Sequence, residues 1–331
     1  MSTKLPLDSH EITKLTIGQF PHDCVFVIAP HPDDSVLGCG GLLKKIVDGK
    51  KDCRICIFVM TPGFEGVSSE FLSRAMHSPD IRKSLSRWLS IDASGMVTVA
   101  DLAKKLSGDR TTADLLTQFT RANSASDKQK AENLLKTAIR FSESWREAEQ
   151  LGLNPPDSLR FLALPHLYRR QITPVELERV AQEFETCARN ARKPLLLTPH
   201  PSDPQAAHRA STEAALRALN PSLEYTVWYY QSPWHSTLPE EIDVVVSLSD
   251  DELQAKINGA RQHESQTERT PYDSLVSAQA RINADKLPEM LLGYGKTYHS
   301  AFGNNSEVYQ MRLREFYAPD AESGRVIVYT A

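Results

Sequence analysis

The sequence has few cysteines, no excess of basic residues and no long apolar run, and each absence argues against a class of protein. Five cysteines among 331 residues do not form the disulfide framework of a small secreted domain. The 42 aspartates and glutamates outnumber the 38 lysines and arginines, so a basic face for nucleic acid or a membrane surface is not expected. No window reaches the about 18 consecutive apolar residues of a transmembrane helix, and residues 1–15 lack the apolar core of a signal peptide. We therefore expect a soluble, cytoplasmic protein.

One pair of cysteines has the spacing of a metal or redox motif. Cys53 and Cys56 form a CxxC sequence within the apolar run DCRICIFVMT. Residues three apart on a strand point to opposite faces, so the two thiols would not converge on one ion. We interpret them as buried strand cysteines.

Apolar runs and helix-like segments alternate along the chain. This alternation predicts a doubly wound, mostly parallel α/β sheet of the Rossmann-like kind. The expected strands are residues 24–29, 55–61, 159–164, 195–198, 225–230 and 244–248, and the expected helices are residues 36–48, 174–192, 203–219, 251–267 and 277–292.

One segment interrupts the alternation. Residues 68–135 contain helix-like pieces separated by Gly, Ser, Asp and Asn, without a strand pattern. We expect a single α/β domain over residues 1–331, with a helical insertion at 68–135 and a C-terminal extension at 271–331.

Two polar clusters follow expected strands, where open α/β sheets bind their ligands. His31, Asp33 and Asp34 follow the first strand, and His208 lies early in the helix after the strand 195–198. His31, Asp34 and His208 would give two imidazoles and a carboxylate, a ligand set that suits a catalytic zinc with one open position. Asp33, which faces another way than Asp34, would serve as general base.

Each of these residues also has an ordinary explanation. The HPDD sequence alone is compatible with a turn and a helix cap, where Asp is common. His208 alone fits a helix histidine, and Asp203 is placed to cap that helix. The metal hypothesis rests on their occurrence together at two strand ends.

The stretch APHPDD after an apolar strand, followed by Gly38, Gly40 and Gly41, resembles the PIG-L / LmbE-like family of zinc-dependent N-deacetylases. The resemblance covers residues 22–67 and 136–270. Two further motifs of the family are also matched. Arg140 and Glu143, followed by Leu151 and Gly152, resemble an Arg-x-x-Glu helix that ends in Leu-Gly, and His263, Ser265 and Gln266 resemble a His-x-Ser-Gln motif. The resemblance implies removal of the acetyl group from an N-acetylglucosaminyl compound, with zinc on His31, Asp34 and His208 and with Asp33 as the base.

The chain departs from the family pattern at two positions. Ser35 stands where the family usually has a glutamate, and Gln205 stands where it has a histidine that assists the reaction. A glutamine can donate a hydrogen bond to an oxyanion but cannot deliver a proton. His200 is the candidate for the missing acid, and His166 is a second candidate, because both follow strands.

The substrate is the least determined feature. Arg140 could bind a phosphate or carboxylate, although a structural role is favoured, and His166 and Trp234 could line the substrate site. The expected partner is a small N-acylated amino sugar, without nucleic acid or membrane insertion, and a homo-oligomer stays compatible with the sequence. The alternatives are an amide hydrolase for a non-sugar metabolite and a non-catalytic protein that binds a sugar or a partner.

Overall fold

The computed structural model describes residues 11–79, 83, 127–164, 167, 172–237, 242–290, 305–311 and 325–330. The strands are β1 (Glu11–Thr16), β2 (Cys24–Ala29), β3 (Arg54–Val59), β4 (Leu159–Phe161), β5 (Pro194–Pro199), β6 (Thr226–Tyr230), β7 (Val244–Ser247), β8 (Ser306–Met311) and β9 (Arg325–Thr330). The helices are α1 (Asp34–Gly49), α2 (Ser69–Ala75), α6 (Asp127–Gln150), α7 (Pro155–Ser158), α8 (Pro174–Ala188), α9 (Ala206–Ala218), α10 (Asp250–Arg261), α11 (Glu264–Thr267) and α12 (Tyr272–Met290), with short 3₁₀ turns η2 (Ile17–Gln19) and η3 (Phe64–Gly66).

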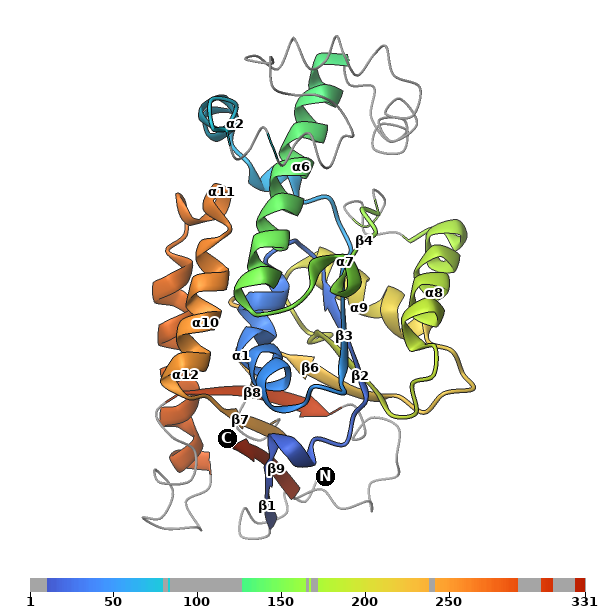
Figure 1. Ribbon diagram of the computed structural model, residues 1–331, viewed down its shortest axis with the longest axis vertical. Coiled ribbons are helices and arrows are strands. Elements are labelled where there is room, and N and C mark those ends of the chain that lie inside the picture. Colours follow the sequence, from blue (N-terminus) through green and yellow to red (C-terminus); the bar gives the residue numbers. More distant parts are fainter. Residues whose placement is uncertain are drawn as a thin grey trace, which may run out of the picture.

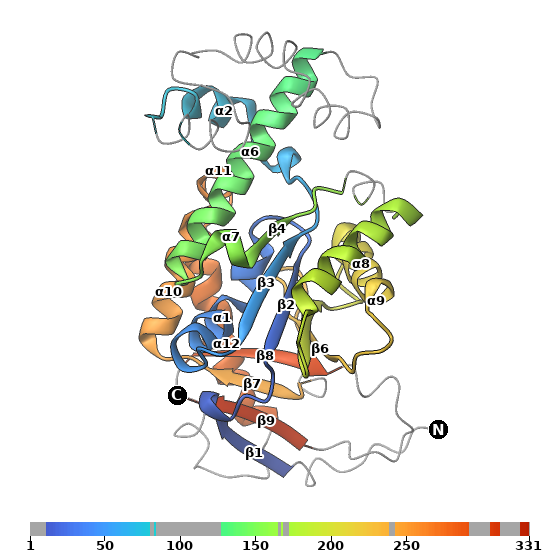
Figure 2. The same ribbon diagram turned by 45° about the vertical axis from the view of Figure 1, so that its right-hand side comes forward.

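The strands of the described residues form one sheet in the order β1-β9-β7-β8-β6-β5-β2-β3-β4. All neighbouring pairs are parallel except those of β8 with β6 and β7, which are antiparallel. Helices cover both faces: α1, α10 and α12 lie on one side and α8 and α9 on the other (Figures 1 and 2). The predicted doubly wound, mostly parallel α/β sheet is therefore confirmed.

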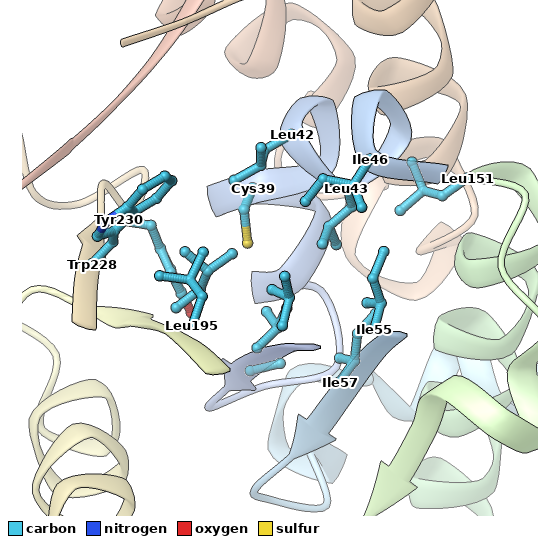
Figure 3. Packing of buried hydrophobic residues seen from close by; sticks show 14 of the residues in the cluster. Cys39, Leu42, Leu43, Ile46, Ile55, Ile57, Leu151, Leu195, Trp228 and Tyr230 are labelled. Atoms are coloured by element: carbon cyan, nitrogen blue, oxygen red, sulfur yellow. The ribbon is translucent and has the colours of Figure 1, made fainter. Parts of the chain in front are cut away.

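The residues of β2 explain its central place, because a strand covered on both faces needs an apolar side chain at every position. All six of its residues are buried. Val25, Val27 and Ala29 pack under α1, and Phe26 and Ile28 pack under α8 and α9. Figure 3 shows the first cluster, in which Cys39 and Leu43 of α1 approach the strands.

Helix α1 is interrupted at Cys39, and a side chain from a distant part of the sequence accepts hydrogen bonds from the backbone N–H groups that follow the interruption. Cys39 has non-helical backbone angles (φ −140°, ψ 16°), and the backbone N–H groups of Gly41 and Leu42 each donate to a carboxylate oxygen of Glu307 at 2.9 Å. Lys256 and the hydroxyl of Tyr309 hold the same carboxylate, at 2.6 and 2.7 Å. Glu307 of β8 thus acts as the cap of the second half of α1.

A glycine brings α1 close to the sheet. A Cβ built on Gly38 would lie 2.3 Å from the ring of Tyr230, so no larger residue fits without a shift. The small residues after the HPDD sequence therefore let the start of α1 rest on β6.

Several sequence expectations differ from the structure. Residues 251–267 form two helices, α10 and α11, because the backbone of His263 leaves the helical region. The strands β1, β8 and β9 were not expected from the sequence, although β8 lies inside the sheet.

The predicted insertion 68–135 is only partly described. Its described part contains α2 and the start of α6, and residues 80–82 and 84–126 lie outside the described residues. The expectation of two buried strand cysteines holds for Cys56 alone, because Cys53 lies just before β3 and is half-buried; both are free thiols. No helix of the described residues is long and apolar enough to cross a membrane.

Candidate functional site

A cavity of about 230 Å³ opens where β2 and β3 end, beside the start of α9. It follows the rule that parallel sheets bind ligands beyond the carboxyl ends of their strands. Its described lining consists of His31, Asp33, Asp34, Leu37, Gly63, Glu65, Gly66, Arg140, Gln205, Trp234, Gln266 and Tyr272.

Three potential ligand atoms converge at the base of this cavity. Nδ1 of His31 and Oδ2 of Asp34 lie 3.1 Å apart, and Nε2 of His208 lies 3.3 Å from each of them. A tetrahedral zinc with bonds of about 2.0–2.2 Å would hold neighbouring ligand atoms about 3.3–3.6 Å apart, so the three atoms fit such an ion with little movement. Among the described residues, His31, Asp34 and His208 are the group of metal-ligating side chains whose ligand atoms lie close enough together to hold one ion.

Asp203 fixes the orientation of His208. Its Oδ2 accepts a hydrogen bond from Nδ1 of His208 at 3.0 Å and another from the hydroxyl of Ser232. Because Nδ1 donates to Asp203, Nε2 is the nitrogen that faces His31 and Asp34, and its lone pair would be available to a metal once the imidazole is neutral. Asp203 is not the N-cap residue of α9, as the sequence suggested, because Gln205 takes that position. Oδ1 of Asp203 instead accepts a hydrogen bond of 2.8 Å from the backbone N–H of Gln205.

The potential ligand residues form a cluster of charged groups that is mostly buried. Burial opposes the charge of Asp34, but the positive charge and hydrogen bond of His208 outweigh it and lower the pKa of Asp34. Burial likewise opposes protonation of His208, but Asp34 and Asp203 raise its pKa to about 10. A cation at this position would therefore replace a proton on His208.

Asp33 has a different environment from its neighbour Asp34. Its Oδ1 lies 3.0 Å from Nη2 of Arg140, and its Oδ2 accepts a hydrogen bond from the Tyr272 hydroxyl at 2.7 Å. Burial raises the pKa of Asp33, but the positive charges of Arg140, His263 and His31 together outweigh burial, so the pKa is lowered. Asp33 is thus ionised and rigidly held at the cavity wall.

Behind Arg140 lies a buried set of charged groups on α6 and α11. Nη1 of Arg140 binds Glu143 at 2.8 Å, and Glu143 also accepts hydrogen bonds from the backbone and hydroxyl of Ser265. Nε2 of His263 lies 2.7 Å from Glu147, which in turn accepts a hydrogen bond of 2.6 Å from Ser35. Burial opposes the charge of His263, but Glu143 and Glu147 raise its pKa to about 9.

The predicted residues are only partly brought together. Gln205 and Trp234 line the cavity, and the side chain of Trp234 is 52% exposed. Arg140 also lines it, but its guanidinium already binds two carboxylates. His166 lies outside the described residues.

His200 is not brought to the cavity lining. Its Nδ1 accepts from the backbone N–H of Ser202 at 3.1 Å, and its Nε2 lies 2.5 Å from Oε1 of Gln310. Its ring stacks on that of His235, with centroids 4.4 Å apart. Both ring nitrogens are therefore occupied, and the acid role of His200 stays a prediction without a contact to the site.

Two residues of the site were not found from the sequence. Glu147 could have been found, because its spacing of four from Glu143 and seven from Arg140 places all three on one helix face. Tyr272 carried no such signal, since it begins a helix far along the chain and its contact to Asp33 depends on how α12 packs beside α1.

Comparisons with known proteins agree with this architecture. A protein of Bacteroides thetaiotaomicron, named putative glucosamine-6-phosphate deaminase-like protein, is 27% identical over 75% of this chain, which spans only 36% of that relative. Two solved structures share the fold: the conserved protein TT1542 of Thermus thermophilus (TM-score 0.52, 17% identity, 91% of this chain and 99% of that one) and N,N′-diacetylchitobiose deacetylase of Pyrococcus horikoshii (TM-score 0.51, 17% identity, 91% and 89%).

The model of the PIG-L family, described as GlcNAc-PI de-N-acetylase, matches residues 26–219. This span is more than half of the chain and contains His31, Asp33, Asp34 and His208. The resemblance found in the sequence is confirmed, and the chain belongs to the PIG-L family.

Proposed function

We propose that this protein is a zinc-dependent hydrolase that removes an N-acyl group, in the simplest case an acetyl group, from a small molecule containing an amino sugar. The observation that carries the proposal is the convergence of Nδ1 of His31, Oδ2 of Asp34 and Nε2 of His208 beside the ionised Asp33. Membership of a family described as a de-N-acetylase supports it.

His31, Asp34 and His208 are the residues that would hold the metal. A bound zinc would lower the pKa of water and polarise the acyl carbonyl. Asp33 takes a proton from the attacking water, which its carboxylate can do while Arg140 and Tyr272 hold it, because an ionised carboxylate has about four acceptor positions. Arg140 keeps Asp33 ionised and in place.

Gln205 is the candidate donor to the developing oxyanion. It lines the cavity, and its side chain makes no capping hydrogen bond to α9. Its amide N–H can therefore turn toward the acyl oxygen, where a donor in a water-poor site stabilises the transition state.

The size and lining of the cavity favour one sugar ring over a large ligand. At about 230 Å³ the cavity is below the about 300–1,000 Å³ that encloses a drug-sized molecule. The exposed ring of Trp234 offers an apolar face at the rim, and Glu65 offers acceptors for sugar hydroxyls. The names of the Bacteroides relative and of the Pyrococcus deacetylase also refer to amino sugars, which supports the same class.

The test combines metal content with acetate release. Purified wild-type protein should carry about one zinc per chain and release acetate from N-acetylglucosamine or N,N′-diacetylchitobiose. His208→Ala should lose both the metal and the activity, whereas the matched variant His200→Ala, at another buried histidine, should keep the metal. Equal zinc content in both variants would refute the ligand assignment. Release of acetate only from N-acetyl amino acids would instead favour the non-sugar amide hydrolase.

A further inference from the structure

The family's assisting histidine is absent here, and the described lining of the cavity offers few other proton donors. Gln205 occupies that position and cannot give up a proton. His31 and Asp34 are the proposed metal ligands. Arg140 keeps its proton, because burial disfavours its charge but Asp33 and Glu143 more than offset this and raise its pKa. The leaving amine nevertheless needs a proton.

Tyr272 is the lining residue that donates a hydroxyl hydrogen bond to the base. Its hydroxyl donates a hydrogen bond of 2.7 Å to Oδ2 of Asp33. Tyr272 belongs to a buried apolar cluster that also contains Val36 and Leu37 of α1. Burial and the negative charge of Asp33 raise the pKa of Tyr272, so the phenol carries its proton throughout the range in which the enzyme would work. Tyr272 lies beyond the residues matched by the family model.

We infer that Tyr272 is a catalytic residue that protonates the leaving amine, in place of the histidine that Gln205 replaces. The inference rests on the proposed function. It follows from the direction of one hydrogen bond. While Asp33 is ionised, it can only accept, so the phenol proton points at it. Once Asp33 has taken a proton on Oδ2, that oxygen becomes a donor to the phenol oxygen, and the phenol proton is released toward the cavity.

The proton transfers balance. Water gives one proton to Asp33 while its oxygen bonds to the acyl carbon, and the carbon–nitrogen bond breaks as the amine takes the phenol proton of Tyr272. In the same step Asp33 returns its proton to the phenol oxygen along their hydrogen bond. The products are a carboxylic acid and an amine, and both residues regain their starting protonation.

The experiment compares two substrates that differ in their leaving group. An alkyl amine leaves only when protonated, whereas the 4-nitrophenolate of 4-nitrophenyl acetate leaves without a proton. Loss of a general acid costs typically about 10²–10⁴-fold, so Tyr272→Phe should lower kcat on N-acetylglucosamine by at least about 10²-fold and kcat on the ester by less than about threefold. Zinc content and KM should stay close to those of the wild type.

The matched control is Tyr225→Phe, which removes another phenol oxygen just before β6, among the apolar residues under α9. It should leave both rates unchanged. Equal losses on the two substrates in Tyr272→Phe would overturn the inference, because a residue that only positions Asp33 acts on both reactions. That outcome would leave the proposed function intact. Inactivity of the wild type on every N-acetyl compound would overturn the proposed function, and this inference with it.

A measurement on the wild type alone provides a second test. If two protons move in the step that releases the amine, kcat on N-acetylglucosamine should depend on the deuterium fraction of the solvent along a curve. A straight line, which indicates a single proton in flight, would overturn the relay through Tyr272.

Discussion

The hydroxyl of Ser35 donates a hydrogen bond of 2.6 Å to Glu147, a residue 112 positions later in the chain. Glu147 lies on α6, so its carboxylate reaches Ser35 from a different element of the fold. The same carboxylate pairs with His263 at 2.7 Å. This carboxylate therefore connects the first turn of α1 with the start of α11, and burial raises its pKa.

Glu147→Ala should be strongly destabilising, because it leaves His263 buried without one of its two carboxylates. Breaking one partner of a buried pair costs about 3–5 kcal/mol in the free energy of unfolding. Ser35→Ala should cost less, about 1.5–3 kcal/mol for a hydrogen bond to a charged group. Chemical denaturation measures both. Glu149→Ala, on the exposed side of the same helix, should stay within about 0.5 kcal/mol of the wild type, and a similar loss there would contradict the assignment.

Asp203→Asn should weaken metal binding without emptying the ligand set. The amide can present its N–H to Nδ1 of His208 and so favour the wrong tautomer, and losses of such supporting contacts typically cost about 10–100-fold in metal affinity. Competition with a chelator of known affinity measures the change. Asp48→Asn, at an exposed pair with Lys44, is the control. Unchanged affinity in Asp203→Asn would show that the orientation of His208 is set by other contacts.

Asp33→Asn should retain zinc and lose most of the turnover. The substitution removes the proton acceptor but keeps the shape of the side chain, and a positioned base contributes about 10²–10⁴-fold. Acetate release and elemental analysis should be measured on the same preparation. Near-wild-type turnover would exclude Asp33 as the base, and loss of zinc would place it among the ligands.

The stability of the protein should depend on pH through His263. Its pKa is raised from 6.5 to about 9 in the folded state, so its contribution is fully present below pH 6.5, declines as pH rises, and is absent above pH 9. The decline amounts to at most about 3 kcal/mol. Denaturation of wild type and His263→Gln at pH 6 and pH 9.5 should show a difference that shrinks at the higher pH. A constant difference would mean that His263 is neutral in the folded protein.

Gln205→His should introduce a titrating group at the cavity. If the glutamine side chain faces the acyl oxygen, the variant should show an additional pKa in its profile of kcat against pH, since such profiles report the groups that act in catalysis. It should also restore part of the turnover of Tyr272→Phe on N-acetylglucosamine. A profile identical to that of the wild type would place Gln205 away from the reacting atoms.

The sequence was sufficient for the features that depend on short segments. The β2–α1 unit has its chemistry within a short segment, so the strand and the turn with His31 and Asp33 could be predicted, although α1 begins at Asp34 and not at the expected residue 36. The proximity of His208 to His31 and Asp34 could also be expected, because the carboxyl ends of parallel strands lie at one edge of the sheet.

The remaining features depend on side chains that meet across long separations. The role of Asp203 could not be distinguished from a helix cap, because both need a carboxylate just before a helix. The isolation of His200 depends on Gln310 of β8, an antiparallel strand that the alternating pattern did not reveal. Tyr272 and Glu147 reach the site only through the packing of α12 and α6.

The bond between Glu307 and the break in α1 also bears on the order in which the chain folds. Gly41 and Glu307 are 266 residues apart in sequence, so the contact closes a very long loop. During synthesis at about 5–20 residues per second, the carboxylate follows its partner by roughly 15–50 s. Until then the N–H groups of Gly41 and Leu42 have no carboxylate to bind. The turn with His31 and Asp34 therefore leaves the ribosome long before the side chain that secures the second half of the helix behind it.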